Sequence, residues 1–392
     1  MDRDLRLGVV GAGERGRHHL REAYRIDEQH YFGRNPDESS LRSPQPIYDA
    51  HAADSPAWVA DVSDLRPSVT AVFDPSATAR RKTTALCREH GDEPDTFDAL
   101  DAFLERGVYD AVIVASPNDR HLEAAVPLLE RGVSVLCEKP LAITLEAYDR
   151  LEVAVSRSDG VFYPGFNLRS HPAYERLGEL LDEGVIGDLG MISCREVRTP
   201  FPEGHYYTQA ESGGSLLEKN CHDFDLMNWL TDADPVRVCA FGGQHVFTTD
   251  TDVSDHAVVI VEYDNGVRAT LELCLYAPYG EWHPEFSGRR DYQFRGGEGV
   301  LRSATDGDAD WELYTRRRRE TYETAGVGGG HGGSDARQLR SFLRCVRDDD
   351  RPTATVRDAK RAAAVALAAT RSIEDGRVVE IDSNADLRHR DR

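Results

Sequence analysis

The chain has 392 residues, of which 40% are hydrophobic and 30% are charged, with 33 glycines and 18 prolines. This length suits two domains of ordinary size, and the composition excludes a collagen-like, disordered or disulfide-scaffold protein. Asp and Glu number 69 against 47 Lys and Arg, which gives a formal net charge of −22. A chain this acidic is not expected to bind nucleic acids generally.

Several features predict a cytoplasmic protein. No run approaches the roughly 18 apolar residues of a membrane span, and the N-terminus enters a strand-like run at once, without room for a signal peptide. The seven cysteines are scattered without a C-x-x-C pair, which favours a reducing compartment. Only four basic residues are lysines, and this acidic, arginine-rich balance fits adaptation to high salt, so we expect a halophilic source.

The first part of the chain alternates strand-like and helix-like segments. Helical segments follow strand-like runs at 5–10, 69–74, 110–116 and 133–139. The runs are nearly continuously apolar, which is typical of a parallel sheet covered on both faces. Residues 27–66 are polar and break the rhythm, and we interpret them as an insertion. The sequence therefore predicts a doubly wound α/β domain over residues 1–145.

The pattern changes in the second part, which we predict to be an α+β domain over residues 146–382. Strand-like segments follow one another from about residue 185, and Asp264, Asn265 and Gly266 form a strong hairpin signal. We expect a mostly antiparallel sheet, with helices at 171–183, 215–231, 334–348 and 356–375. The glycine-rich tract at 328–333 is interpreted as a linker, with closure over the site as the alternative.

A glycine motif follows the first strand. Gly11, Gly13 and Gly16 form G-x-G-x-x-G between this strand and the next helix. The first glycine permits a tight turn, the second admits a pyrophosphate, and the third lets the helix pack on the strand. The free N–H groups of the helix would face the phosphates. The motif in this context predicts dinucleotide binding.

The end of the second strand bears on the choice of cofactor. Asp74 lies there, where a carboxylate would bind the adenosine ribose and disfavour a 2′-phosphate. It follows Gly16 by 58 residues (74 − 16), not the usual 20 or so, and the insertion accounts for the excess. Arg80 and Arg81 could serve a 2′-phosphate. We therefore favour NAD and leave NADP open.

Polar residues follow the next two strands at the edge where such sheets bind ligands. Ser116, Pro117 and Asn118 end one strand, with His121 opening the next helix, and Glu138-Lys139-Pro140 ends the other. The residues predicted to bind the cofactor are Gly11, Ala12, Gly13, Glu14, Arg15, Gly16, Asp74, Ser116, Pro117, Asn118, His121, Glu138 and Lys139.

These segments together resemble a known family. GAGERG, ASPNDRH and LCEKPLA, followed by GFNLRSHP and GGSLLEKNCHDFDLMNW, are similar in order and spacing to the oxidoreductases named after glucose–fructose oxidoreductase, inositol dehydrogenase and the rhizopine-catabolism protein (Gfo/Idh/MocA). The resemblance covers nearly the whole chain except 27–66 and the last ten residues. It implies an NAD(P)-binding Rossmann domain, a second domain whose open sheet forms a homo-oligomer interface, and an active site between the two domains.

The family's D-x-x-x-H pair falls on Glu218 and His222. In a helix these residues are i,i+4 neighbours, with Asp225 one turn beyond His222. The acid here is Glu where Asp is common, and Asn220 stands where many members have Gly. A carboxylate and an imidazole on a buried helix need partners or a catalytic role. We interpret Lys219, on another face of this helix, as structural or as a contact at the rim of the site.

The resemblance implies hydride transfer between a secondary hydroxyl of a sugar, polyol or inositol and the nicotinamide. His222 would take the hydroxyl proton, Lys139 would stabilise the reacting oxygen, and Glu218 would orient the imidazole. The residues predicted to contact this substrate are Asn167, Arg169, His205 and Tyr206. His222 and Asp225 lack further ligands at metal-site spacing, so we predict no metal.

Two alternatives stay open on the sequence. One is a glycoside hydrolase or epimerase-like enzyme that recycles a tightly bound NAD. The other is a non-catalytic, ligand-binding regulator, which the Glu218 and Asn220 departures keep in play. Net turnover of free cofactor separates the leading hypothesis from both alternatives.

Overall fold

The computed structural model describes residues 5–25, 65–200, 204–249, 251–277, 289–303, 310–324, 331 and 333–389. The chain forms two compact units. The first unit comprises Met1–Leu141, Asp149–Pro172 and Ala325–Val356, and the second comprises Ala142–Tyr148, Ala173–Thr324 and Arg357–Arg392. The predicted insertion at 27–66 lies outside the described residues, apart from Leu65 and Arg66.

The first unit is built on a six-stranded sheet with the order β3-β2-β1-β4-β5-β6, and all the neighbouring strands run parallel. Its strands are β1 (Arg6–Val10), β2 (Ser68–Phe73), β3 (Asp95–Phe97), β4 (Ala111–Val114), β5 (Ser134–Cys137) and β6 (Phe162–Pro164). Its helical segments are α1 (Glu14–Arg25), α2 (Ala77–Glu89), α3 (Leu100–Arg106), η3 (Asn118–Arg120), α4 (His121–Leu129), η4 (Asn167–Ser170) and α9 (Ser334–Asp348). This order is that of a dinucleotide-binding fold, which confirms the predicted doubly wound domain.

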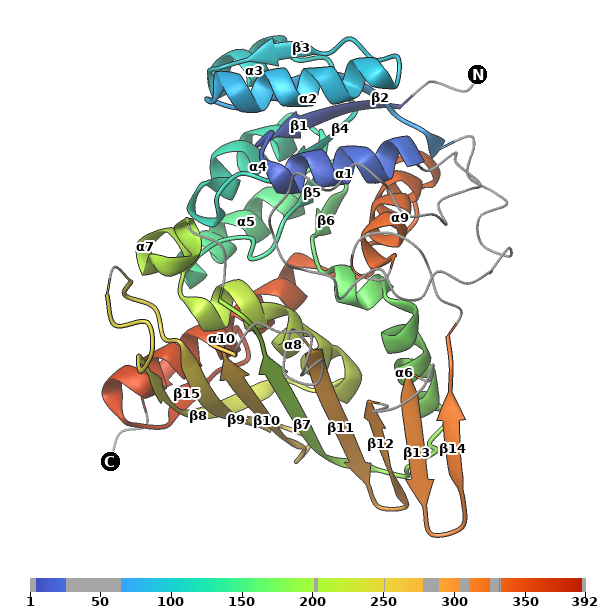
Figure 1. Ribbon diagram of the computed structural model, residues 1–392, viewed down its shortest axis with the longest axis vertical. Helices are drawn as coiled ribbons and strands as arrows, with labels where there is room; N and C mark the ends of the chain where they lie inside the picture. Colours follow the sequence, from blue (N-terminus) through green and yellow to red (C-terminus); the bar gives the residue numbers. More distant parts are fainter. Residues whose placement is uncertain are drawn as a thin grey trace. The chain divides into compact units, whose positions relative to one another are not determined.

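Helices cover both faces of this sheet (Figure 1). β4 and β5 are buried along their whole length, as the continuous apolar runs predicted. One core joins Leu7 and Val9 of β1 to Leu20 of α1 and Phe342 of α9. Gly8 faces the other side of the sheet, where a side chain would meet Phe103 of α3. Apolar burial on both faces therefore fixes the six strands in one layer between helices.

The second unit carries a ten-stranded sheet with the order β14-β13-β12-β11-β7-β10-β9-β8-β15-β16. Its strands are β7 (Leu189–Val197), β8 (Pro235–Gly243), β9 (His256–Tyr263), β10 (Arg268–Cys274), β11 (Arg289–Gly296), β12 (Gly299–Ser303), β13 (Trp311–Thr315), β14 (Arg319–Tyr322), β15 (Val379–Ile381) and β16 (Leu387–His389). Its helical segments are η5 (His205–Tyr207), α7 (Gln209–Ser212), α8 (Ser215–Thr231), α10 (Val356–Asp375) and most of α6 (Pro172–Asp182). Among the described strands β7 and β10 pair in parallel and the other neighbours are antiparallel, as predicted.

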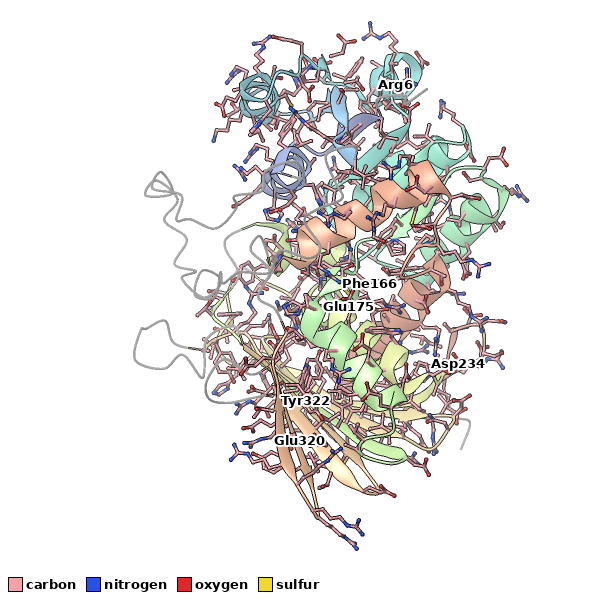
Figure 2. All side chains as sticks on the ribbon, turned by 90° about the vertical axis from the view of Figure 1, so that its right-hand side faces the viewer. Arg6, Phe166, Glu175, Asp234, Glu320 and Tyr322 are labelled. Carbon is pink, nitrogen blue, oxygen red and sulfur yellow. The ribbon has the colours of Figure 1, made fainter. Side chains whose placement is uncertain are left out.

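The strands of this sheet alternate between buried and exposed side chains. In β9 Val259 and Val261 are buried whereas Val258 and Ile260 are exposed, which is the pattern of a sheet with only one covered face. Alternation also brings Glu320 and Tyr322 to the same face of β14 (Figure 2), where the Tyr322 hydroxyl donates to the Glu320 carboxylate at 2.8 Å.

The structure adds elements that the sequence patterns did not predict. Short strands β3 and β6 extend the first sheet, and β12 to β16 extend the second. α5 (Leu145–Arg157) contains the point at which the chain passes from the second unit back to the first. The α9 segment, which a linear boundary at residue 145 assigns to the second domain, belongs to the first unit because its apolar face packs in that core. No helix in the described ranges is long and apolar enough to cross a membrane.

Candidate functional site

The glycine motif forms a tight loop between β1 and α1. Gly11 has a φ of +88°, and a Cβ there would lie 2.5 Å from the Ala115 carbonyl oxygen. A Cβ on Gly16 would lie 2.0 Å from the Gly11 carbonyl oxygen, so only glycine lets α1 approach the strand this closely. Gly13 has open space around its Cβ position. The loop therefore has the three properties that the motif predicts for a pyrophosphate cradle.

Asp74 holds this loop from the end of β2. Its Oδ2 accepts a hydrogen bond from the Ala12 N–H at 2.9 Å, and its Oδ1 accepts from the Ser76 N–H at 2.8 Å. The Arg80 guanidinium donates to the carbonyl of Asp74 at 2.6 Å, and Arg81 donates to the Thr78 hydroxyl at 3.0 Å. Both arginines thus have partners within their own segment, which favours NAD over NADP.

The end of β4 lies beside the same loop. The Ser116 Oγ is buried and has no hydrogen-bond partner. His121 is buried, and its Nδ1 and Nε2 each lie 2.8 Å from a backbone carbonyl, of Pro140 and Ser116 respectively. The His121 ring therefore connects two loops through these carbonyls. We expect the residues around it, rather than its ring nitrogens, to contact a cofactor.

Glu138, at the end of β5, is held by two side chains of α1. Its Oε1 lies 2.7 Å from Arg15 Nε and 2.5 Å from His19 Nε2. Arg15 also donates to both oxygens of Asp335, at 3.1 and 2.9 Å. We call Arg15, His19, Glu138 and Asp335 the loop cluster. The side chain of Arg15 is thus engaged by Glu138 and Asp335. We therefore expect Arg15 to contact a cofactor through its backbone.

The loop cluster has strongly perturbed protonation. Burial would raise the pKa of Glu138, but the charge of Arg15 and the hydrogen bond with His19 outweigh it and hold the pKa well below its usual value. The pKa of Asp335 is lowered in the same way, mainly by Arg15, against burial. Burial and the nearby Arg15 lower the pKa of His19, so its imidazole is neutral near pH 7.

Two of the predicted substrate residues lie on η4 and face α9 or the segment after it. The Asn167 amide donates to Asp335 at 2.8 Å, and Arg169 donates to the Thr353 carbonyl at 2.9 Å. Gly165, just before η4, lies so close to β5 that a Cβ would be 2.9 Å from the Cys137 oxygen. The chain thus passes tightly behind Glu138 and Lys139, and the amide of Asn167 helps to anchor it there.

These features fit a dinucleotide. The cradle of Gly11 and Gly16 lies at the N-terminus of α1, the carboxylate of Asp74 lies at the end of β2, and the Ser116 Oγ lacks a protein partner. They converge where β1 and β4 lie side by side and the strand order reverses, which is where such sheets bind nucleotides. The residues present can therefore hold NAD.

In the second unit, α8 carries the predicted acid and imidazole. The helix spans Ser215–Thr231, and Glu218 and His222 are 6% and 9% exposed. The predicted helix over 216–230 is thus confirmed, with the pair one turn apart. Asn220 is fully buried, and its side-chain amide donates to Asp223 at 2.9 Å. The side chain at this position, where the sequence comparison suggested glycine, thus has a hydrogen-bond partner on the same helix.

A further titratable residue, Lys219, lies beside this pair. Its Nζ is 3.1 Å from Glu196 Oε1, and Arg290 lies 3.3 Å from Glu196 Oε2 and 2.8 Å from Asp223 Oδ1. We call Lys219, Glu196, Asp223 and Arg290 the helix cluster. Burial and the charge of Arg290 lower the pKa of Lys219 to about 7. The sequence placed Lys219 correctly on another face but gave no sign of this perturbation, because Glu196 and Arg290 come from distant strands.

The remaining predicted positions are more exposed or lie outside the described residues. His205 and Tyr206 lie on η5 with ring centroids 4.1 Å apart. Of the glycine-rich tract at 328–333, only His331 and Gly333 are within the described ranges.

Comparison with known proteins gives matches over both units. A family model described as the NAD-binding Rossmann fold of the GFO_IDH_MocA oxidoreductase family matches residues 5–166. The model for the C-terminal alpha/beta domain of the same family matches residues 178–381. Together the two models cover most of the chain.

Individual relatives are distant in sequence. The rhizopine catabolism protein MocA of Rhizobium meliloti is 26% identical over 59% of this chain, and the match spans 58% of that protein. Myo-inositol 2-dehydrogenase of Thermotoga maritima is 26% identical over 70% of this chain and 80% of its own length. A structure of levoglucosan dehydrogenase in complex with NADH covers 97% of this chain and 100% of its own, with a TM-score of 0.77 and 18% identity. At this identity the structural likeness shows a shared fold.

Proposed function

We propose that this chain, which belongs to the Gfo/Idh/MocA oxidoreductase family, is a dehydrogenase that transfers a hydride between a secondary hydroxyl of a sugar, polyol or inositol and NAD. The observation that carries the proposal is the cradle of Gly11 and Gly16 beside Asp74 and Ser116, which fits a dinucleotide. The substrate class is supported by relatives named as inositol dehydrogenases. Neither the hydrolase nor the regulator alternative gains support from these relatives.

The proposed chemistry divides between cofactor and protein. When bound, the nicotinamide accepts or donates the hydride. His222 takes the proton of the substrate hydroxyl, and Glu218 orients its imidazole from one turn earlier in α8. Lys139 donates to the reacting oxygen and stabilises the negative charge that develops there.

The substrate contacts are proposed on the same basis. His205 and Tyr206 offer polar groups and stacked rings on η5, which suit a polyhydroxy ligand. The Asn167 amide and the Arg169 guanidinium donate to Asp335 and Thr353. We therefore propose that Asn167 and Arg169 position the segment after β6 rather than select the substrate.

The test is the absorbance of reduced nicotinamide, recorded with NAD and NADP separately across a panel of inositols, sugars and polyols in high KCl. Formation of NADH with at least one compound is expected, and NADPH should form more slowly. No reduced cofactor with any compound, together with NAD retained by the purified protein, would contradict net dehydrogenation. It would favour an enzyme that recycles its own cofactor.

We further propose that the second unit forms a homo-oligomer through the exposed face of its sheet. Phe241 is 74% exposed and pairs directly with Val258 across β8 and β9, and Ile260 is exposed beside them. Contiguous apolar side chains of this kind mark protein interfaces. Light scattering should give a multiple of 43.6 kDa, and Val258→Asp should yield the monomer; a monomeric native protein would contradict the proposal.

A cytoplasmic location is proposed from the cysteines. All seven are free, and five of them are buried in the two cores. Such thiols are typical of proteins kept in a reducing compartment.

A further inference from the structure

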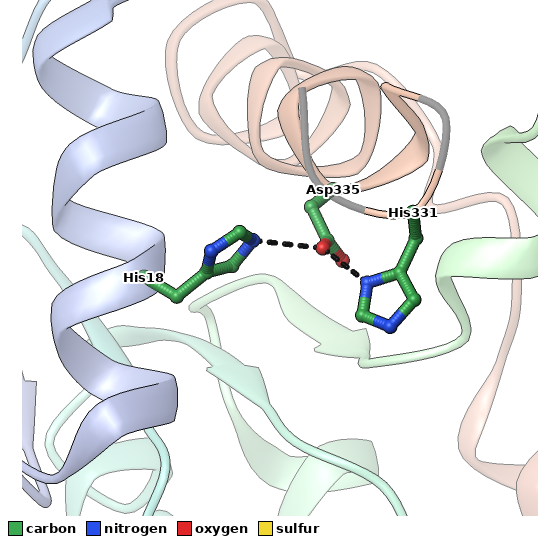
Figure 3. Close-up of side chains that lie close together, drawn as sticks. All are labelled: His18, His331 and Asp335. Atoms are coloured by element: carbon green, nitrogen blue, oxygen red, sulfur yellow. Dashed lines mark hydrogen bonds and ion pairs between the residues drawn. The ribbon is translucent and has the colours of Figure 1, made fainter. Parts of the chain in front are cut away.

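Two histidines and one carboxylate converge in the first unit, next to the loop cluster. His18 Nε2 lies 2.8 Å from Asp335 Oδ2, and His331 Nδ1 lies 2.6 Å from the same oxygen. All three ligating atoms lie within 4.8 Å of one another. Figure 3 shows the two rings approaching the carboxylate from different sides. They come from α1, from a residue three positions before α9 and from the first turn of α9.

The Asp335 carboxylate has only one hydrogen-bond acceptor position left for the two histidine rings. Each carboxylate oxygen offers about two acceptor sites. Oδ1 accepts from Arg15 at 2.9 Å and from Asn167 at 2.8 Å, which fills it. Oδ2 accepts from Arg15 at 3.1 Å, so a single site faces two imidazole nitrogens. One N–H fills such a site, whereas three ligand atoms that converge on one point form the beginning of a metal centre.

The local charge also calls for a cation. The groups in direct contact with one another include the carboxylates of Glu138, Asp335 and Glu22 and the guanidinium of Arg15. All three carboxylates are buried, and the cationic side chains close to them are those of Arg15 and, beside Glu138, Lys139. The buried carboxylates outnumber these cationic side chains, so this environment favours the binding of a further cation.

We propose that His18 Nε2, His331 Nδ1 and Asp335 Oδ2 bind one divalent transition-metal ion, with Zn²⁺ as the best match. Two imidazoles and a carboxylate are a ligand set that Zn²⁺ takes, with a fourth position for water. The ligands of a tetrahedral Zn²⁺ lie about 3.3 Å apart when its bonds are about 2.0–2.2 Å long. The nitrogens therefore draw back from Oδ2 by about half an ångström, which the 46% exposed side chain of His331 can do.

The bound ion fastens the start of α9 to α1. Asp335 already joins α9 to Arg15 in the glycine loop, so the metal adds a second link between the same two elements. It is a structural site, and the ion takes no part in the proposed hydride transfer. The proposed metal site is therefore tested independently of the proposed function.

Cobalt provides the direct test. The full chain, without a histidine tag and freed of metal with EDTA, is titrated with Co²⁺ while the visible d–d absorption of the bound ion is followed. We expect one Co²⁺ per chain, displaced by Zn²⁺, and binding at least about tenfold weaker in His331→Ala and in His18→Ala. Zn²⁺ at about 100 times its Kd should raise the Tm by about 5 °C in the native protein only.

The matched control is His245→Ala, which removes an exposed histidine of the second unit and should leave the titration unchanged. Circular dichroism checks that each variant is folded. Two results would overturn the proposal: no Co²⁺ spectrum, or a spectrum that survives in both His331→Ala and His18→Ala. The convergence would then be a hydrogen-bonded cluster that binds no metal ion.

Discussion

Two charged clusters among the described residues, the loop cluster and the helix cluster, differ in whether all of their carboxylate oxygens accept hydrogen bonds. In the loop cluster both Asp335 oxygens and Oε1 of Glu138 accept hydrogen bonds of 2.5–3.1 Å. In the helix cluster both oxygens of Glu196 are buried without a hydrogen bond and only face cations, Lys219 at 3.1 Å and Arg290 at 3.3 Å. The hydrogen bonds of the loop cluster suit a rigid scaffold. In the helix cluster, by contrast, Lys219 can lose its proton near pH 7.

This difference follows from what each cluster supports. The loop cluster ties the phosphate-binding loop to α9, and a cradle that must hold a dinucleotide gains from being rigid. Two members of the helix cluster, Lys219 and Asp223, lie on α8, the helix that also carries Glu218 and His222. A change of protonation at Lys219 therefore occurs on the same helix as the proposed base. Two substitutions test the comparison, a third tests the glycine loop itself, and a fourth tests the proposed chemistry.

The largest effect is expected for Asp335→Asn, which replaces a fully buried carboxylate with a neutral amide beside the guanidinium of Arg15. Breaking one partner of a buried pair costs about 3–5 kcal/mol, so the free energy of unfolding in urea should fall by that amount near pH 7, with EDTA present. The pKa of Asp335 is lowered in the folded state. The stabilisation that Asp335 provides is therefore complete above its unfolded pKa and is lost as the pH falls through its folded pKa. The difference in unfolding free energy between the native protein and Asp335→Asn should accordingly become smaller in acid.

The control for Asp335 is Asp110→Asn, which breaks an exposed pair with Arg6. A surface pair contributes less than about 1 kcal/mol. Equal losses in the two variants would show that the loop cluster has no special role.

A smaller effect, with a characteristic pH dependence, is expected for Lys219→Met. Between the folded pKa of about 7 and the unfolded value of about 10.4, the unfolded state binds more protons, so native stability rises with pH. Relative to the variant, the native protein should gain about 2–4 kcal/mol of unfolding free energy from about pH 7 to about pH 10. Lys82→Met, at an exposed lysine, should show no such trend, and parallel profiles for native and Lys219→Met would refute the perturbed pKa.

The smallest of the three effects concerns Asp74, which accepts a hydrogen bond from the Ala12 N–H in the glycine loop. Asp74→Ser removes the negative charge that repels a 2′-phosphate, so the preference for NADH over NADPH should fall by about tenfold or more. Fluorescence titration with each cofactor measures it, with the exposed Asp98→Ser as control. An unchanged ratio of dissociation constants would place the ribose elsewhere.

Local patterns predicted much of this molecule. The glycine motif, the continuous strands at 110–116 and 133–139 and the helix that carries Glu218 and His222 were all found where the sequence placed them, because each is encoded within about twenty consecutive residues. Helices α9 and α10 have the predicted bounds. Short edge strands such as β3, with three residues, lack enough repeats to show a period.

Contacts between segments far apart in the chain could not be predicted from the sequence. Arg15 and Asp335 are 320 residues apart, and no spacing rule links them, so the sequence assigned Arg15 to the cofactor and gave Asp335 no role. His18 and His331 escaped notice for the same reason, and the expectation of no metal rested on His222 and Asp225 instead. The perturbed Lys219 likewise depends on Glu196 and Arg290, which the fold brings to α8 from β7 and β11.

The most direct test of the proposed chemistry is the rate of NADH formation in His222→Ala, with the best substrate of the panel at saturating NAD. General acid–base catalysis by a positioned side chain contributes about 10²–10⁴-fold, so kcat should fall by that factor while the Kd for NADH stays unchanged. The native Tm, within about 2 °C, would show that the variant is folded. Retention of the native kcat in a folded His222→Ala protein would contradict the assignment of His222 as the base and, with it, the proposed mechanism.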